Sequence, residues 1–413
     1  MNRETDRQER PVVRDGRELV TNISDLKQHA IAAIEAMKDD LVQISTTLYA
    51  NPELAFQEFQ AAALLCQTLE AHGFTVERGA GGLETAFRAE ARGKGDEPTI
   101  AILAEYDALP DLGHACGHNI IGTAAVAAGI AVRKVMDELT GRVLVIGTPA
   151  EEGGGGKLIL LKQGVFRDVD AAMMVHPSSR TMVERTSLAS SRLTVEFAGK
   201  ASHAAAAPED GINALEAVIL TFNNVNALRL HLKPDARVHG IITHGGTAAN
   251  IIPEYAAAVF SVRAAKHGYA EEIMERVVQC AQAAGIATGA QLSYSIKPGY
   301  AEMIPNPVMA RLFAENWRAI GVEVHEPRPH ERMGSTDMGN VSHAVPSVHP
   351  YIAIAPDGTA GHTVEFREAC LSPAAHEGML NAAKGMAMTA IDLLSSPETM
   401  REVKQQFAVT GRK

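Results

Sequence analysis

Side chains that can bind a metal ion or move a proton are concentrated after three apolar runs of this sequence. They are Cys116 and His118 after the first run, the adjacent Glu151 and Glu152 after the second, and His176 after the third. Thiolate, imidazole and carboxylate groups are the ligand types of transition-metal sites. Metal-assisted hydrolysis also needs a proton acceptor, which an extra carboxylate can supply. The pattern therefore predicts a metal-dependent hydrolase.

A layered fold must position these three groups. We expect strands at 99–103, 142–147 and 171–175, with helices at 120–139 and after the glycines that follow Glu152. Strands that alternate with helices predict an α/β domain with a largely parallel sheet. Because ligands gather outside the carboxyl ends of the strands in such sheets, the three groups should meet at one edge.

A ligand role for Cys116 and His118 competes with a plain alternative, a buried thiol beside a loop histidine. The i, i+2 spacing with Gly117 between them lets both side chains turn toward one centre. Asp107 lies in the same stretch of sequence. A carboxylate beside a metal-binding imidazole more often orients the ring than binds the ion, and we expect that role for Asp107.

The adjacent carboxylates of Glu151 and Glu152 repel each other, so the pair is disfavoured unless it is exposed or compensated. A solvated acidic turn is the alternative interpretation. A metal resolves the conflict, because one carboxylate can bind the ion while the other takes a proton from the attacking water.

The pattern changes in the middle of the chain. Residues 191–298 predict the order β-α-β-β-α-β, which is the ferredoxin-like arrangement. Helices are also expected at 23–48, 53–72, 307–320 and 374–394. The simplest organisation is a polar N-terminal arm (1–20), a catalytic α/β domain in two parts (21–190 and 299–413) and an inserted ferredoxin-like domain (191–298).

Composition narrows the function classes. Hydrophobic residues make up 46% of the 413 residues, and the formal net charge is -11, which argues against nucleic acid as a partner. We expect no membrane association, since no apolar run reaches the length of a membrane helix. The N-terminal arm does not resemble a secretory signal. The four cysteines lack paired spacing and suit a reducing, cytoplasmic location.

Two further histidines are not assigned by local reasoning. His362 follows the apolar run 351–355, and a core or surface histidine is the better interpretation of it alone. His203 ends the first strand of the inserted domain, so it can approach the metal site only if domains or subunits fold over one another.

These motifs resemble the family-20 metallopeptidases, the aminoacylase and carboxypeptidase type of two-metal hydrolases. The sequence His-Ala-Cys-Gly-His-Asn at 114–119 matches the amidohydrolase branch of that family. The segments 105–110, 148–157 and 334–342 are similar to dipeptidases acting on β-alanyl-lysine-type peptides and to aminobenzoyl-glutamate hydrolases. The resemblance covers nearly the whole chain and implies an inserted domain that serves as a lid and in dimerisation.

The resemblance also implies a role for each matching residue. The ligands of two divalent metal ions, zinc first with manganese or cobalt as alternatives, would be Cys116, His118, Glu152, His176 and His362. Glu151 would be the general base and acid, and His203 would hydrogen-bond the developing oxyanion in the active site of the other protomer of a dimer. Asn250 and Arg263 would hold the substrate carboxylate.

The sequence departs from the family at two positions. The wider family has His-x-Asp where this chain has Glu105, Tyr106 and Asp107, so the first histidine ligand is missing, and the resemblance to the branch implies that Cys116 takes its place. Asn119 replaces an Asp that is found in much of the branch. Both differences leave the distribution of the two metals over the five ligands open.

The expected activity is hydrolysis of the amide bond in small dipeptides or N-acyl amino acids. An N-acyl amino acid deacylase, an aminobenzoyl-glutamate hydrolase and a carboxypeptidase are alternatives with the same chemistry. Two other classes remain: a cysteine hydrolase with Cys116 as its nucleophile, and a metal- or peptide-binding module without catalysis.

Overall fold

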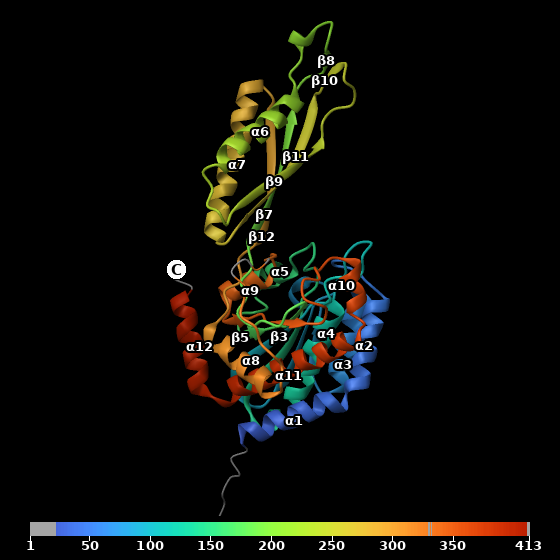
Figure 1. The fold of residues 1–413 in the computed structure, drawn as a ribbon, viewed down its shortest axis with the longest axis vertical. Helices are drawn as coiled ribbons and strands as arrows, with labels where there is room; N and C mark the ends of the chain where they lie inside the picture. Colours follow the sequence, from blue (N-terminus) through green and yellow to red (C-terminus); the bar gives the residue numbers. More distant parts are fainter. Residues whose placement is uncertain (1–21, 329–330, 332, 411–413) are drawn as a thin grey trace, which may run out of the picture.

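The computed structural model describes residues 22–328, 331 and 333–410. The chain forms a broad catalytic domain and a narrow lid domain that stands on it, and the two are joined through neighbouring strands (Figure 1). The predicted N-terminal arm (1–20) lies outside the described residues. Each domain has its own buried apolar core, which explains how one can be inserted into the other.

The main sheet of the catalytic domain has six strands in the order β1-β2-β4-β3-β5-β13. The strands are β1 (Thr75–Arg78), β2 (Phe87–Arg92), β3 (Lys94–Ala104), β4 (Thr140–Gly147), β5 (Ala171–Met173) and β13 (Ser347–Val348). Only β2 runs against its neighbours, so the largely parallel sheet is confirmed with this one exception. A small parallel pair, β6 (His176–Ser178) and β14 (Tyr351–Ala353), lies beyond β5.

Helices cover this sheet on both faces. They are α1 (Ile23–Ala36), α2 (Lys38–Ala50), α3 (Phe59–Ala71), α4 (His118–Arg133), α5 (Gly156–Lys162), α8 (Pro307–Ala319), α9 (Met338–Ala344), α10 (Val364–Ala369), α11 (Pro373–Ser395) and α12 (Pro397–Thr410). Helix α4 is buried from residue 118 to residue 132. Its small residues permit this, since a Cβ atom on Gly129 would lie 2.3 Å from Val145 Cγ2.

Three predicted helices are wrong in extent. The expected helix 120–139 ends at Arg133, and a separate short turn of helix follows at Met136–Glu138. The expected helix 23–48 is two helices that meet at Met37, where Asp39 and Asp40 in the first turn of α2 favour a new N-terminus. The expected helix 53–72 begins only at Phe59. The reason is that the Glu53 carboxylate accepts hydrogen bonds from the first turn of α3, at 3.1 and 2.9 Å, and the chain between them is not helical.

The lid domain has the predicted ferredoxin-like fold. Its elements are β7 (Ala189–Ala198), β8 (Ser202–His203), α6 (Ala214–Arg229), β9 (Arg237–His244), β10 (Ile251–Ile252), β11 (Tyr255–Ala264), α7 (His267–Thr288) and β12 (Gln291–Tyr300). The four long strands pair antiparallel in the order β12-β7-β11-β9, and α6 and α7 cover one face (Figure 1). Strands β7 and β12, at the start and end of the lid, are therefore neighbours and form the connection to the catalytic domain.

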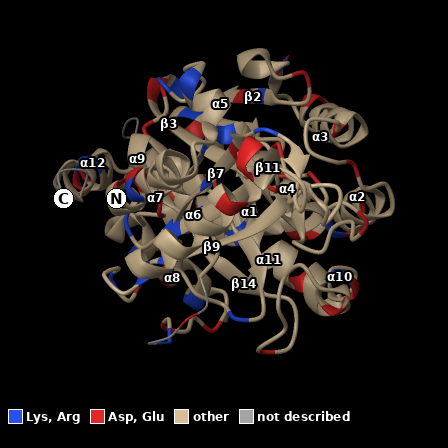
Figure 2. Cartoon of the chain, turned by 90° about the horizontal axis from the view of Figure 1, so that it is seen from above, with Lys and Arg blue, Asp and Glu red and all other residues tan. Residues whose placement is uncertain are grey.

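Charged residues of both signs are interspersed over the elements of the two domains (Figure 2). Among the described residues, no helix combines the length and apolarity needed to cross a bilayer. A separate group of charged side chains, which includes Glu105, Lys157 and Asp337, is buried at the edge of the main sheet.

Candidate metal centre

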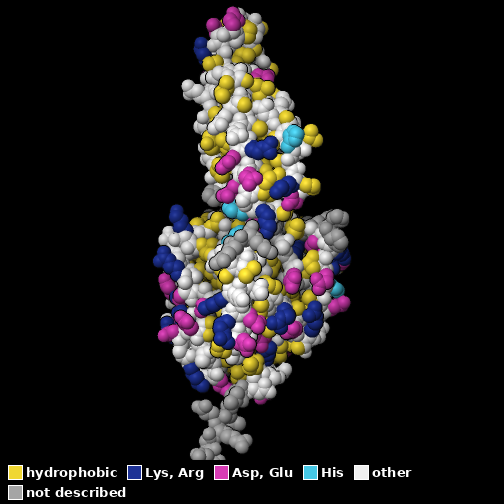
Figure 3. All heavy atoms as spheres, turned by 90° about the vertical axis from the view of Figure 1, so that its left-hand side faces the viewer, with side chains coloured by type: hydrophobic (Ala, Val, Ile, Leu, Met, Phe, Trp, Pro, Cys, Tyr) yellow, Lys and Arg dark blue, Asp and Glu magenta, His cyan; other side chains and the backbone are white. Residues whose placement is uncertain are grey.

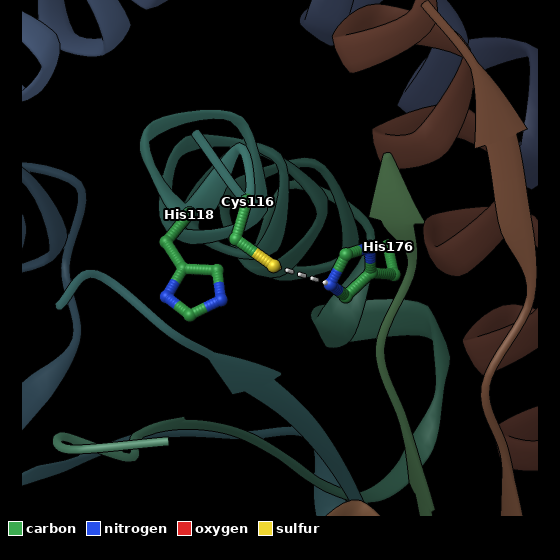
Figure 4. Close-up of side chains that lie close together, drawn as sticks. All are labelled: Cys116, His118 and His176. Atoms are coloured by element: carbon green, nitrogen blue, oxygen red, sulfur yellow. Dashed lines mark hydrogen bonds between the residues drawn. The ribbon is translucent and has the colours of Figure 1, made fainter. Parts of the chain in front are cut away.

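The three predicted groups of reactive residues meet at one edge of the sheet. Strands β4, β3 and β5 are parallel neighbours, so their carboxyl ends lie side by side. Cys116 and His118 lie at the start of α4, which follows β3; the glutamate pair follows β4; and His176 begins β6, directly after β5. Figure 4 shows the Cys116 thiol between the His118 and His176 imidazoles.

The distances among these donor atoms suit ligands that share an ion. Cys116 Sγ lies 3.4 Å from His176 Nε2 and 3.3 Å from His362 Nε2. Glu152 Oε1 lies 3.3 Å from His362 Nε2 and 3.9 Å from His118 Nε2. Ligands of one tetrahedral zinc ion are about 3.3–3.6 Å apart, as its bond lengths require. The five predicted ligands thus form two groups that share Cys116, one with His118 and His176 and the other with Glu152 and His362.

Asp107 orients two members of the cluster. Its Oδ1 lies 3.1 Å from His118 Nδ1, and its Oδ2 accepts a hydrogen bond of 2.9 Å from the Glu152 backbone N–H. The backbone carbonyl of Asp107 is also 2.8 Å from His118 Nδ1. These contacts leave the other ring nitrogen, Nε2, facing the cluster, which is the arrangement expected from the sequence.

The backbone is strained where it presents the cluster. Ala150, directly before the glutamate pair, has a φ of 62°, and His362 has a φ of 61°. Such left-handed conformations of non-glycine residues persist only where surrounding contacts enforce them. At Ala150 the enforcing contact is a buried carboxylate, because Glu58 Oε1 accepts a 2.8 Å hydrogen bond from the Ala150 N–H.

Three atoms of the cluster that could bind a metal ion are buried and have no hydrogen-bond partner among the described residues. They are Glu105 Oε2, His118 Nε2 and Glu152 Oε1. Buried polar atoms are normally paired, so unpaired acceptors that face one another fit a bound cation. The donor set of one thiol, three imidazoles and carboxylates suits a divalent transition metal such as zinc.

The pKa values of the two glutamates are shifted in opposite directions. Burial, together with the carboxylates of Glu105 and Asp337, raises the pKa of Glu151 well above its usual range. Burial also acts to raise the pKa of Glu152, but the contacts with His362 and His118 outweigh it and lower that pKa. The two adjacent carboxyls are therefore unequal, as different roles in one site require.

Cys116 does not have the environment of a nucleophile. Burial and the Glu152 carboxylate raise the pKa of the Cys116 thiol well above its usual range. A nucleophilic cysteine needs a lowered pKa, which positive neighbours or a helix N-terminus provide. This direction disfavours the cysteine-hydrolase alternative and agrees with a thiol that a metal would deprotonate.

Sequence reasoning missed a buried ionic group beside the cluster. Lys157 Nζ lies 2.5 Å from Glu105 Oε1 and 2.6 Å from Asp337 Oδ1, and all three side chains are at most 1% exposed. Each of these residues belongs to a motif of the family, yet nothing in the spacing of a lysine and two acids so far apart in sequence reveals that they meet. The only sign of this group in the sequence was Glu105, an acid at the position where the wider family has a histidine ligand.

The three remaining predicted residues lie apart from the cluster or at its margin. His203 in β8 and Asn250, whose carbonyl accepts a hydrogen bond from Ala204 N–H, are exposed at the end of the lid farthest from the catalytic domain (Figure 1). Arg263 of β11 does approach the site and lies 3.5 Å from Ser335 Oγ. Within one chain, therefore, only Arg263 of these three lies near the cluster.

The cluster opens into a cavity of about 700 Å³ between the two domains. Its walls include Glu151 and His176 of the catalytic domain and Arg263 of the lid. Histidine side chains are visible where the lid meets the catalytic domain (Figure 3). A cavity of this size accepts a small substrate and not a folded protein.

Comparisons with known proteins identify the family of this chain. Residues 101–376 match the model of peptidase family M20/M25/M40. The chain belongs to this family. It is 38% identical to the mouse Xaa-Arg dipeptidase, with 92% of each chain covered. It is also 31% identical to one of the subunits of the p-aminobenzoyl-glutamate hydrolase of Escherichia coli, with 91% of this chain and 93% of that one covered.

A solved structure shows the same fold. A Bacillus subtilis protein described as a dinuclear metal binding peptidase from the M20 family aligns with a TM-score of 0.68 at 22% identity, over 87% of this chain and 99% of that one. The expected fold class is confirmed. The M20 chain is a metal-dependent peptidase or amidohydrolase, which contradicts the alternative of a binding module without catalysis.

Removing the metal distinguishes this chemistry from thiol chemistry. We expect a strong chelator, followed by dialysis, to abolish hydrolysis, and stoichiometric divalent metal to restore it, because the buried cluster depends on a cation. Activity and metal content are measured on the same samples, and chelator already saturated with the metal is the control. Full activity in metal-free protein would contradict the assignment.

Proposed function

We propose that this M20 enzyme hydrolyses the amide bond of small dipeptides or N-acyl amino acids. The observation that supports the proposal is the position of Glu151. Its carboxylate reaches within 4.8 Å of donor atoms of His118 and Glu152, and it also lines the cavity between the domains. A proton acceptor is thus placed beside a metal-binding cluster, where a substrate carbonyl can enter.

The ligands of the proposed two-metal centre are Cys116, His118, Glu152, His176 and His362. The ions would be zinc first, with manganese or cobalt as alternatives. When bound, such ions lower the pKa of a coordinated water and polarise the scissile carbonyl.

The protein's own residues then move the proton and orient the substrate. Glu151 accepts the proton of the attacking water and returns it to the leaving amine, and its raised pKa suits both transfers. Arg263 and Asn250 hold the substrate carboxylate, Arg263 with a bidentate guanidinium. His203 donates a hydrogen bond to the oxygen that gains charge in the transition state.

We propose further that the active protein is a homodimer formed through the lid. His203 and Asn250 are exposed at the far end of the lid, so they can serve a site only in another chain. The exposed side chains of Ile241, Ile242, Tyr294 and Ile296 on lid strands support this, since apolar exposure of 45–66% on a sheet is typical of an interface. A cytoplasmic location is part of the proposal and is supported by four cysteines that remain free.

Replacement of the base tests the chemistry. We expect Glu151→Gln to keep both metals and to lower kcat by roughly 10²–10⁴, the usual contribution of a positioned acid–base group. Metal content and kcat are measured together, and Glu272→Gln on the exposed face of α7 is the matched control. Turnover close to that of the wild type would exclude Glu151 as the base.

Subunit exchange tests the contribution of His203 to the other chain. His203→Ala and Glu151→Gln dimers should each be nearly inactive, whereas a hybrid dimer has one intact site. With complete exchange, half of the dimers are hybrids, so the mixture should recover about a quarter of wild-type activity.

The control mixture contains the His203→Ala protein and the Glu151→Gln/His203→Ala double variant, which cannot form an intact site. Exchange is followed independently with differently tagged chains. If exchange is complete and activity stays at the level of the separate variants, the shared site is refuted.

Charge in the cavity favours a second candidate, a hydrolase of acyl-glutamates. Outside the metal cluster, the described lining includes four arginines and two acids, and both acids are paired with arginines. These residues are Arg180, Arg185, Arg263, Arg328, Glu331 and Asp357. A wall with excess positive charge attracts an anionic side chain and repels a cationic one.

A direct comparison of substrates decides between the two candidates. We expect kcat/KM for p-aminobenzoyl-glutamate to exceed that for a dipeptide ending in arginine by at least about tenfold, because like charges brought together cost more than ~1.4 kcal/mol. A dipeptide with a neutral C-terminal residue should fall between them. The reverse order would favour a dipeptidase that prefers a C-terminal arginine.

A further inference from the structure

The Glu105 carboxylate has one satisfied and one unsatisfied oxygen. Oε1 lies 2.5 Å from Lys157 Nζ, whereas Oε2 is buried without a hydrogen-bond partner among the described residues. Oε2 lies 3.5 Å from His118 Nε2, which is unpaired as well. An acceptor and an imidazole nitrogen that face each other without bonding are arranged as two ligands of one cation would be.

Lys157 fixes this orientation of Glu105. Its ammonium bridges Glu105 Oε1 and Asp337 Oδ1, and its backbone N–H donates a 3.1 Å hydrogen bond to Asp337 Oδ2. Both carboxylate oxygens of Asp337 therefore have a partner on Lys157. Of the two carboxylates beside Lys157, only that of Glu105 has an oxygen without a partner among the described residues. The buried ion pair holds the carboxylate in one rotamer, as a ligand requires.

The separation of Oε2 from His118 Nε2 matches that of two ligands on one ion. A zinc ion with bonds of about 2.0–2.1 Å to nitrogen and oxygen places them about 3.3–3.4 Å apart. The 3.5 Å observed is closer to this value than the 3.9 Å between His118 Nε2 and Glu152 Oε1. Glu105 also occupies the position where the wider family has its first histidine ligand.

We propose that Glu105 is a sixth ligand of the metal centre and binds through Oε2 to the ion that His118 holds. This rests on the proposed metal-dependent function and extends it. Glu105 then adds a carboxylate ligand to those that the resemblance implies, and Lys157 offsets the added negative charge. The centre has the donors for two ions even though Asn119 has lost the carboxylate found in much of the branch.

Metal binding by three variants tests the proposal. Glu105→Gln removes the charge, Glu105→Asp keeps the charge but shortens the reach, and Asp337→Asn alters the other partner of Lys157. Free zinc is buffered with a competing chelator, bound zinc is counted, and the visible spectrum of the cobalt-loaded protein reports the ligands. Thermal unfolding of the metal-free proteins verifies that each variant folds.

We expect Glu105→Gln and Glu105→Asp to raise Kd for the weaker ion by at least about tenfold and to change the cobalt spectrum, since loss even of an orienting partner costs 10–100-fold. Asp337→Asn removes a partner of Lys157 and not a ligand, so it can lower the affinity for zinc, but its cobalt spectrum should remain that of the wild type. Wild-type affinity or an unchanged cobalt spectrum in both Glu105 variants, or the same spectral change in Asp337→Asn, would overturn the proposal. A wild-type protein that binds no metal would instead refute the metal-dependent function itself.

Discussion

The structure depends on how buried negative charge is neutralised at the edge of one sheet. Five carboxyl groups and a thiol gather there, and the ammonium that lies among them comes from Lys157. Their residues are Glu105, Asp107, Glu151, Glu152, Asp337 and Cys116. Like charges at such distances cannot all be ionised in a dry interior without counter-charge. Divalent ions bound as proposed would supply that charge, so the cluster that destabilises a metal-free fold would become reactive once loaded.

The lid is attached directly to the loop that carries the proposed base. Tyr300 at the end of β12 donates a 2.6 Å hydrogen bond to the Glu151 carbonyl, and Lys297 of the same strand donates one of 2.8 Å to the Gly153 carbonyl. Glu58 holds the strained Ala150 from the opposite side. The base therefore sits between the two domains, and a movement of the lid would act on its position as well as on access to the cavity.

Local patterns predicted much of the fold and the ligand groups, but not their electrostatic setting. The apolar runs before Cys116, Glu151 and His176 sufficed, because strand ends in a parallel sheet share an edge. The turn before Phe59 was missed because the apolar pattern does not reveal that the carboxylate of Glu53 folds back to cap α3. The Lys157 group was missed because a buried ion pair joins residues far apart in sequence, and no periodicity marks them. Local patterns could not assign His203, since its proposed role is in the active site of a second chain.

The proposed mechanism requires that the cluster holds two divalent ions beside Glu151. A crystal structure of the metal-loaded protein, with anomalous diffraction collected at the absorption edge of the metal, tests it most directly. We expect two anomalous peaks, both bounded by Cys116, His118, Glu152, His176 and His362. Peaks elsewhere in the molecule, or an active protein with no peak at this cluster, would contradict it.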